Sequence, residues 1–328
     1  MNLNGRKVVL TGVGGFIGLA LARRFSAMGA IVHGLDMSKN AVLRAKSQGV
    51  LAEVGDVCSS DSVRNALEGA ELVVHTAAVV GEGGDFAHYE RINVGGTRNV
   101  LAAAAHHGVA MVHLSSVMVY GFTYPEGVTE EGPFRGEGNA YCETKLRSDH
   151  EVLAAAERGQ RALVIRPGDV YGVGSVPWVI RPVDMLRKGL FVLPDGGRGL
   201  INHVHLENLV DALVAAVTRD AWGRAFNVTD GVRTSNLEYF TRLAALIGVP
   251  KVRTAPAALL RPLFAMVARG ARLLGREPPA TEEAVNFLMR DAMVSSARAQ
   301  AELAWKPKIT LEDGMREIAR SLRNPSAI

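Results

Sequence analysis

The sequence predicts an α/β fold in which a doubly wound parallel sheet is followed by a smaller, mostly helical C-terminal lobe. Two observations predict it. Short apolar runs alternate with helical patterns along most of the 328 residues, and a glycine-rich turn joins the first run to the first helix. With 48% hydrophobic residues, a chain of this length can bury a sizeable core.

The expected elements follow one another in a regular order. Predicted strands lie at 7–10, 30–35, 50–54, 71–75, 110–114, 162–166 and 225–229, and predicted helices lie near 19–25, 60–68, 92–107, 139–158 and 206–218. Strands that alternate with helices form a parallel sheet, and ligands of such a sheet bind beyond the carboxyl ends of its strands. The residues that follow each strand are therefore where we expect functional side chains.

The glycine-rich turn after the first strand, from Gly12 to Gly18, has the spacing of a dinucleotide-binding motif. Gly12 permits a tight turn, Gly15 lets the backbone approach a pyrophosphate, and Gly18 lets the helix pack closely on the strand. The N-terminus of that helix then faces the phosphate charge. Because the motif lies between a predicted strand and a predicted helix, it predicts a dinucleotide site.

Asp36 follows the second predicted strand and indicates which dinucleotide binds. A carboxylate at this place accepts hydrogen bonds from a free ribose 2′-hydroxyl and repels a 2′-phosphate. The next four residues, Met37 to Asn40, include one cation, Lys39. NAD is therefore expected in preference to NADP.

Two further strand ends carry residues that suit a dinucleotide. Asp56 and Val57 follow the third strand, where they could reach the adenine. The fourth strand runs into His75-Thr76-Ala77-Ala78, whose small residues leave room for a ribose, although both segments could also be plain strand ends.

Three residues suggest catalysis. Ser116 follows the strand at 110–114, and Tyr141 and Lys145 come 25 and 29 residues later within a predicted helix. A spacing of four places Tyr141 and Lys145 on one helical face. A neighbouring ammonium would lower the tyrosine pKa, so that Tyr141 could exchange a proton at working pH while Ser116 steadies the substrate oxygen.

Further motifs join these in an order that resembles one family. In chain order the matching segments are Thr11–Gly18, Gly55–Val57, His75–Ala78, Asn93–Val100, Ser115–Gly121, Tyr141–Lys145, Arg166–Gly172, Asn202–Ala212 and Glu302–Lys308. The chain resembles the extended short-chain dehydrogenases/reductases, a superfamily that includes sugar-nucleotide epimerases, dehydratases and 3-beta-hydroxysteroid dehydrogenases. The resemblance implies a Rossmann-type domain over 1–175, to which 201–232 return, and a substrate lobe made of 176–200 and 233–328.

The resemblance also implies roles for single residues. Ser116, Tyr141 and Lys145 would be the catalytic trio, and Lys145 would also hold the nicotinamide ribose. The residues that would line NAD are Gly12, Gly15, Phe16, Ile17, Asp36, Asp56, Val57, Ala77, Ala78, Tyr141 and Lys145, with Pro167 and Val170 beside the nicotinamide and substrate.

The residues at the expected substrate-contacting positions indicate to which branch of the superfamily the chain is most similar. Sugar-nucleotide epimerases usually carry a diphosphate-binding arginine where this chain has Ile201, and a later arginine and aspartate where it has Val285 and Leu288. A diphosphate bound away from water needs such cations. The sequence thus favours an apolar steroid-, terpenoid- or lipid-like substrate and a hydroxysteroid-dehydrogenase-like enzyme that moves a hydride between nicotinamide and a secondary alcohol or ketone.

Two alternatives stay open. A shift of register would bring Arg290 and Asp291, or Arg198 and Arg181, to the diphosphate, which would make the protein a nucleotide-sugar epimerase or dehydratase. The fold could also belong to a non-catalytic NAD-binding protein, although such relatives often lose the tyrosine–lysine pair. Asp169 could bind substrate or cap the turn that follows it.

The net charge of +4 is concentrated in one segment, because 251–276 contains six cations and no acid. On a helix, Arg261, Arg269, Arg272 and Arg276 would share an arc of roughly 80°, opposite Leu260, Leu263, Phe264, Val267 and Leu274. Such a helix could rest on an anionic membrane surface, or it could be a substrate-lobe helix with a solvated arginine face. Because the patch lacks interleaved aromatic residues, no nucleic-acid partner is expected.

Location and assembly complete the expectations. The two cysteines, Cys58 and Cys142, suit a reducing compartment, and without a signal peptide or a membrane-spanning run a cytoplasmic protein is expected. His113, His203 and His205 lack companions at metal-ligand spacing, so no metal is expected. Alanine-rich stretches in the helices at 92–107 and 139–158 suggest a homodimer, as the family commonly pairs these helices.

Overall fold

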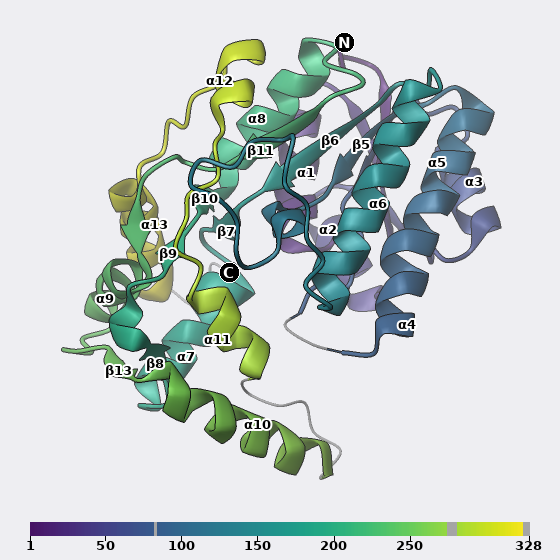
Figure 1. Ribbon diagram of the computed structural model, residues 1–328. Coiled ribbons are helices and arrows are strands. Elements are labelled where there is room, and N and C mark those ends of the chain that lie inside the picture. Colours follow the sequence, from purple (N-terminus) through teal and green to yellow (C-terminus); the bar gives the residue numbers. More distant parts are fainter. Residues whose placement is uncertain (82–83, 274–280, 324–328) are drawn as a thin grey trace.

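The computed structural model describes residues 1–81, 84–273 and 281–323 (Figure 1). Its centre is a sheet of seven parallel strands in the order β3-β2-β1-β4-β5-β6-β11. These strands are β1 (Lys7–Thr11), β2 (Ile31–Asp36), β3 (Leu51–Val54), β4 (Leu72–His75), β5 (Ala110–Leu114), β6 (Ala162–Pro167) and β11 (Ala225–Val228). All seven occupy the predicted positions, and the strand order reverses between β1 and β4, where doubly wound sheets bind ligands.

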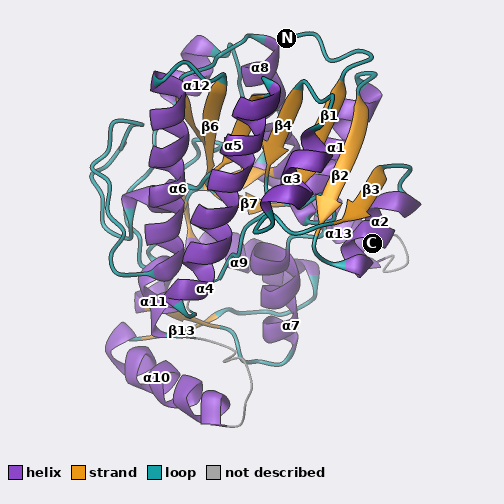
Figure 2. Cartoon of the chain, turned by 90° about the vertical axis from the view of Figure 1, so that its right-hand side faces the viewer, coloured by secondary structure: helices purple, strands orange, loops and turns teal. Residues whose placement is uncertain are grey.

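Helices cover both faces of the sheet, which confirms the doubly wound fold (Figure 2). One face packs against α1 (Phe16–Ala27) and α8 (Leu206–Thr218), which contact each other, while α2 (Lys39–Ser47) lies beside β2 and β3. The other face packs against α3 (Ser60–Leu67), α5 (Gly96–His107) and α6 (Ala140–Glu157). The inner strands β4, β5 and β6 are buried throughout, as parallel strands covered on both faces should be.

The predicted helix at 92–107 differs in one respect. The structure has a short helix α4 (Phe86–Tyr89), a π-helical turn over Glu90–Gly95 and then α5, in one continuous run. The wider turn contains Asn93, whose side chain bonds to the backbone of Val79 instead of facing solvent. Single π-turns inside helices often occur at functional sites, and apolar spacing does not reveal them.

The C-terminal lobe has its own aromatic core. Its helices are α7 (Arg181–Arg187), α9 (Asn236–Leu246), α10 (Ala257–Leu273) and α11 (Glu282–Leu288), with a π-helical turn at Val176–Ile180 and a 3₁₀ turn at Asp195–Gly197. Trp178 and Phe191 pack against Tyr239 and Phe240, which lie on α9. These side chains come from segments on both sides of 201–232.

In the described part of the chain, three short strand pairs lie outside the seven-stranded sheet. The pairs are β7 (Asp169–Tyr171) with β10 (His203–His205), β9 (Leu200–Ile201) with β12 (Thr234–Ser235), and β8 (Val192–Pro194) with β13 (Arg253–Ala255). The chain ends with α12 (Ala297–Glu302), which contacts β11, and α13 (Leu311–Arg323), which packs on α9. Among the residues described, no helix has the length and apolar character needed to cross a membrane.

Candidate active site

The glycine turn closes tightly against the end of β4. Gly12 has φ +70°, and a Cβ there would lie 2.9 Å from backbone atoms of Ala77. A Cβ on Gly18 would lie 2.3 Å from the carbonyl oxygen of Gly12, so helix α1 can begin this close to the strand only with glycine. The turn therefore has the shape that the motif predicted, and Phe16 and Ile17 open α1 beside it.

Asp36 ends β2 and holds this turn. Its Oδ2 atom accepts a hydrogen bond from the backbone N–H of Gly14 at 3.1 Å, and its Oδ1 atom accepts one from Ser38 at 3.0 Å. Arg44, on α2, donates to the carbonyl oxygen of Gly14 at 3.2 Å. Arg44 is a second cation near Asp36, beyond the four residues from which the cofactor was predicted. Helical spacing along α2 would have indicated it.

The other expected NAD residues lie at the same edge of the sheet. Asp56 follows β3 and accepts from the N–H of Cys58 at 2.8 Å, and the buried Val57 accepts from Asn99 at 2.9 Å. Ala77 follows β4 and donates its N–H to the Thr11 hydroxyl at 3.3 Å. Residues from three strands are thus brought to one edge, next to the start of α1.

A chain of buried hydrogen bonds joins this edge to α6. The Thr11 hydroxyl lies 2.7 Å from Nδ1 of His75, and Nε2 of His75 lies 3.1 Å from the hydroxyl of Thr97. Thr97 donates to the carbonyl oxygen of Asn93, and the Asn93 amide donates to Thr144 at 3.1 Å. Since the Thr97 proton goes to that carbonyl, His75 must donate from Nε2 and accept at Nδ1. Burial lowers the pKa of His75 to about 3, so it stays neutral in this network.

The three expected catalytic residues converge next to this network. Ser116 begins a 3₁₀ turn, Val117–Tyr120, and its hydroxyl accepts from the N–H of Met118 at 3.1 Å. Tyr141 and Lys145 lie in the first turns of α6, which starts where the Asn139 side chain accepts from the N–H groups of Tyr141 and Cys142. The Ser116 side chain interacts with the Tyr141 phenol. In this arrangement both hydroxyls can act on one substrate oxygen.

Electrostatics at this trio differ from the expectation. Burial raises the pKa of Tyr141 to about 12, and the contact with Ser116 offsets only part of that rise. The Lys145 ammonium donates to the carbonyl oxygen of Leu114 at 2.7 Å, and burial lowers its own pKa to about 8. The expected lowering of the Tyr141 pKa by Lys145 is not found in the chain alone, because burial dominates and Lys145 is not among the groups that shift this pKa.

Toward the C-terminal lobe, the site is bounded by a buried ion pair. Nη2 of Arg290 lies 2.7 Å from Oδ2 of Asp169, and that oxygen also accepts from the N–H of Asn202 at 2.9 Å. Burial alone lowers the pKa of Arg290, but Asp169 and Tyr124 outweigh it and raise the pKa. The Asp169 carboxylate thus pairs with Arg290 and the Asn202 N–H, which is not the turn cap that was one expectation, and substrate binding by Asp169 stays a prediction.

Two of the positions at which sugar-nucleotide epimerases carry diphosphate ligands are apolar and buried here. Ile201 and Val285 are fully packed in the lobe, and Arg198 is exposed. His203 bonds to Asp230 and Thr234, and Nδ1 of His205 accepts from the N–H of Glu207 at the start of α8. Within the described ranges, no three metal-ligating side chains cluster.

The comparison with protein families agrees with this geometry. A family model described as the NAD dependent epimerase/dehydratase family matches residues 8–229. The chain belongs to this family. The resemblance to extended short-chain dehydrogenases/reductases is thereby confirmed, and the protein is an enzyme with NAD as its cofactor.

Individual relatives of this epimerase/dehydratase family member differ in substrate. A 2-alkyl-3-oxoalkanoate reductase of Stenotrophomonas maltophilia is 28% identical, over 96% of this chain and 99% of its own. Sterol demethylase protein B of Methylococcus capsulatus is 30% identical, over 75% and 76%. A solved structure, MoeE5 in complex with UDP-glucose and NAD, has a TM-score of 0.77 at 23% identity, over 98% of this chain and 99% of that one, and shares the fold.

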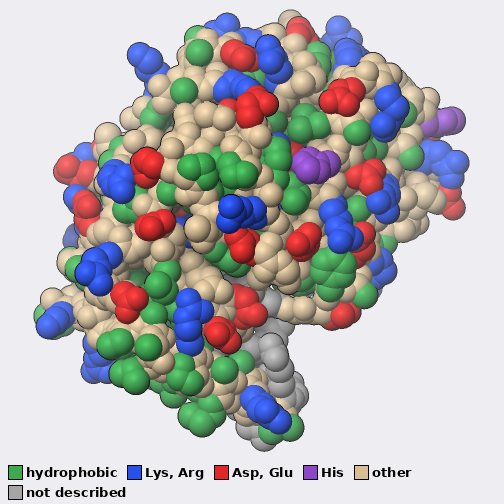
Figure 3. All heavy atoms as spheres, in the orientation of Figure 1, with side chains coloured by type: hydrophobic (Ala, Val, Ile, Leu, Met, Phe, Trp, Pro, Cys, Tyr) green, Lys and Arg blue, Asp and Glu red, His purple; other side chains and the backbone are tan. Residues whose placement is uncertain are grey.

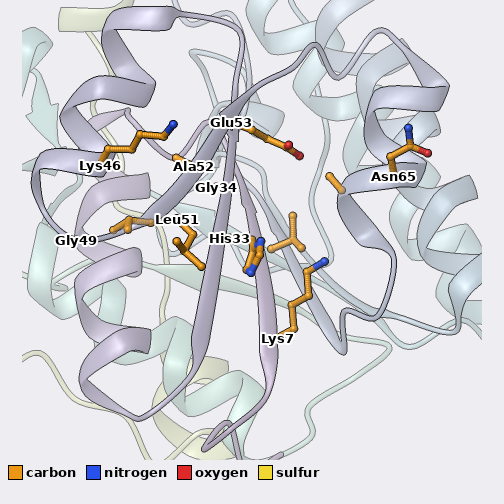
Figure 4. A pocket seen from close by; sticks show the side chains of 12 residues that line it. Lys7, His33, Gly34, Lys46, Gly49, Leu51, Ala52, Glu53 and Asn65 are labelled. Carbon is orange, nitrogen blue, oxygen red and sulfur yellow. The ribbon is translucent and has the colours of Figure 1, made fainter.

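One hollow of the surface lies away from this site. Its volume is about 620 Å³, and Lys7, His33, Leu51 and Asn65 line it over β1–β3 (Figure 4). The lining includes no residue that the family resemblance places around NAD. The hollow starts at the amino ends of the strands, so it does not meet the rule that ligands of a doubly wound sheet bind at the carboxyl ends.

Proposed function

We propose that this enzyme transfers a hydride between nicotinamide and the secondary alcohol or ketone carbon of an apolar, steroid-, terpenoid- or lipid-like substrate. The observation that carries the reaction is the convergence of Ser116 and Tyr141 beside Lys145, at the edge where the glycine turn lies. Bound NAD supplies the nicotinamide carbon that accepts or donates the hydride. The protein side chains handle the proton and the charge on oxygen.

In the reductive direction, each hydroxyl of the trio has a definite task. With a pKa of about 12, the Tyr141 phenol is protonated at neutral pH, which is the form that donates a proton to a carbonyl oxygen. Ser116 is placed to donate a hydrogen bond to the same oxygen as negative charge develops there. The buried Lys145 ammonium, four residues after Tyr141 on α6, favours that charge.

The proposal of an apolar substrate is supported by the residues at the positions where sugar-nucleotide epimerases carry diphosphate ligands. Ile201 and Val285 stand where diphosphate ligands are usual, and both are buried against apolar neighbours. Two relatives have names that contain an alkyl oxoalkanoate and a sterol. Burying apolar surface contributes about 25 cal/mol per Å², so a rigid hydrocarbon skeleton can bind here without an ion pair.

The experiment is a ligand screen followed by turnover. NAD-loaded protein is heated with UDP, dTDP and GDP, and in parallel with sterols, terpenols and long-chain hydroxy compounds. We expect thermal shifts only with the lipophiles, and NADH oxidation with the matching ketones. A strong shift with a nucleoside diphosphate and none with a lipophile would replace this proposal with the epimerase or dehydratase reading.

We further propose that α10 contacts an anionic lipid surface. Leu260 packs on α11, but Leu263 and Val267 of the expected apolar face are exposed, and so are Leu259, Met266 and Leu273. Figure 3 shows hydrophobic side chains gathered on the surface at this end of the molecule. Arg269 is exposed on the same helix; Leu274 and Arg276 lie outside the described residues. Co-sedimentation with anionic vesicles, but not with neutral ones, is expected, and Met266→Ser should weaken it.

The dimer also stays a proposal. We expect α5 and α6, which lie side by side and are bridged by Arg98 and Glu151, to pair with the same helices of a second copy. Their alanines could instead reflect helix propensity alone. Sedimentation at micromolar concentration tests the proposal, and a mass near 35 kDa would contradict it.

A further inference from the structure

The ion pair between Asp169 and Arg290 lies next to the expected catalytic residues. Asp169 opens β7, two residues after Pro167, and Arg290 follows α11. Nη1 of Arg290 is 3.5 Å from the sulfur of Met118, which is two residues beyond Ser116. Asp169 and Arg290 also interact electrostatically with Tyr141 and Cys142, so the pair lies near the start of α6.

The remaining contacts of Arg290 leave it dependent on Asp169. Its Nε atom donates to the carbonyl oxygen of Phe287 at 2.9 Å, and its guanidinium stacks 4.0 Å from the Phe287 ring centre. The Met118 sulfur is a weak acceptor, and the Tyr124 hydroxyl, which also interacts with this guanidinium, is uncharged at neutral pH. Among the described residues, Asp169 is the one carboxylate that forms an ion pair with this guanidinium, and the two side chains are 4% and 1% exposed.

We propose that Asp169 is a specificity-determining residue, which occupies the anion-binding position of Arg290 and thereby excludes diphosphate-bearing substrates. This inference rests on the proposed function, because it explains how a chain of this family accepts apolar substrates in place of nucleotide sugars. A diphosphate that reached Arg290 would have to displace Asp169 and remain beside its charge. Two like charges in a buried site disfavour each other strongly.

Removal of the Asp169 carboxylate should make Arg290 available to an anion. Without the Asp169 carboxylate, Arg290 is a buried charge with no ionic partner, a state that an incoming anion relieves. A guanidinium binds phosphate oxygens through two parallel hydrogen bonds, so pyrophosphate and UDP are the anions expected to fit. Arg290 is therefore a phosphate ligand that the Asp169 carboxylate blocks.

The test uses Asp169→Ala in the full-length, NAD-loaded protein. Calorimetric binding of UDP and pyrophosphate should strengthen by roughly tenfold or more relative to the wild type, and both anions should raise the melting temperature of the variant alone. Asp169→Ala/Arg290→Met should lose the gain. Sodium chloride at the same ionic strength serves as the control for screening.

A matched control lies elsewhere in the chain. Asp149 and Arg166 form a second buried pair at 2.7 Å, with both side chains 0% exposed, between α6 and β6. Asp149→Ala also leaves a buried arginine unpaired, but Arg166 also donates to the Tyr120 hydroxyl and the Glu130 carbonyl oxygen and does not contact Met118. The Asp149→Ala variant should be less stable than the wild type and should gain no affinity for UDP or pyrophosphate.

The outcomes separate this inference from the proposed function. If the wild type reduces a lipophilic ketone but Asp169→Ala binds neither anion more tightly, the role of Asp169 is refuted and the function stands. If the wild type itself binds UDP as tightly as the variant does, both ideas fail. Should Asp169→Ala not fold, Asp169→Asn keeps the side-chain shape, and an absent pyrophosphate shift in that variant refutes the role equally.

Discussion

The Lys145 ammonium donates a hydrogen bond to the carbonyl oxygen of Leu114, 2.7 Å away, and so ties the start of α6 to the end of β5. Tyr141 lies one turn before Lys145 on α6, and Ser116 lies two residues beyond Leu114. One buried contact therefore fixes both sides of the catalytic site. It also carries a cost, because burial takes the ammonium out of water and lowers its pKa to about 8.

That cost predicts a stability change with pH. Between pH 8 and about 10.5 the unfolded chain holds the Lys145 proton more tightly than the folded chain, so the free energy of unfolding should rise with pH across this window. Lys145→Met should lose this rise, which amounts to at most about 3 kcal/mol. Urea unfolding at pH 7.5 and 10 measures it. The exposed Lys188→Met is the control, and an unchanged rise in Lys145→Met would contradict the assignment.

Removing the Tyr141 hydroxyl should separate catalysis from cofactor binding. In Tyr141→Phe, turnover on the true substrate should fall by orders of magnitude, because the proton donor is lost while the NAD-binding turn stays intact. Steady-state kinetics and NADH fluorescence titration provide the two readouts. Tyr239→Phe removes a buried hydroxyl that bonds to Trp178 in the other lobe, and it should retain turnover. Wild-type activity in Tyr141→Phe would refute the mechanism.

The parts of this site that the sequence predicted are local in the chain. The glycine turn and the Tyr141–Lys145 pair depend on spacings within one turn or one helix, and each strand was found within about a residue of its predicted bounds. The pairing of Asp169 with Arg290 joins positions 121 residues apart, and no periodicity signals it. The Tyr141 pKa was misjudged for a related reason, since desolvation depends on the whole fold and not on one neighbour.

Two stacked histidines beneath Lys145 predict acid sensitivity. The rings of His75 and His113 lie 5.5 Å apart, and burial lowers both pKa values, to about 3 for His75. As pH falls below 6.5, the unfolded chain binds protons that the folded chain cannot, so stability is lost toward pH 3. Each imidazole contributes a slope of up to about 1.4 kcal/mol per pH unit.

His113→Leu isolates one of these slopes. Neither ring nitrogen of His113 has a hydrogen-bond partner among the described residues, so its loss leaves no other group unpaired. The variant should be at least as stable as the wild type at pH 7.5, and its acid slope between pH 4 and 6 should be shallower. Denaturant titrations across that range measure the slope, with exposed His106→Gln as the control. Identical slopes in His113→Leu and the wild type would show that His113 titrates normally.

The last prediction concerns the choice between NAD and NADP. Asp36 both braces Gly14 and offers a carboxylate at the end of β2, and Arg44 reaches the same glycine from α2. In Asp36→Ala, NAD should bind roughly tenfold to hundredfold more weakly, because charge-assisted hydrogen bonds to the ribose are lost. NADP should bind more tightly than to the wild type, because Arg44 then meets a 2′-phosphate without an opposing carboxylate. Fluorescence titration with NADH and NADPH measures both, and Asp36→Ala/Arg44→Ala should lose the NADPH gain. If Asp36→Ala weakens the binding of NADH and NADPH equally, Asp36 acts only by bracing the glycine turn.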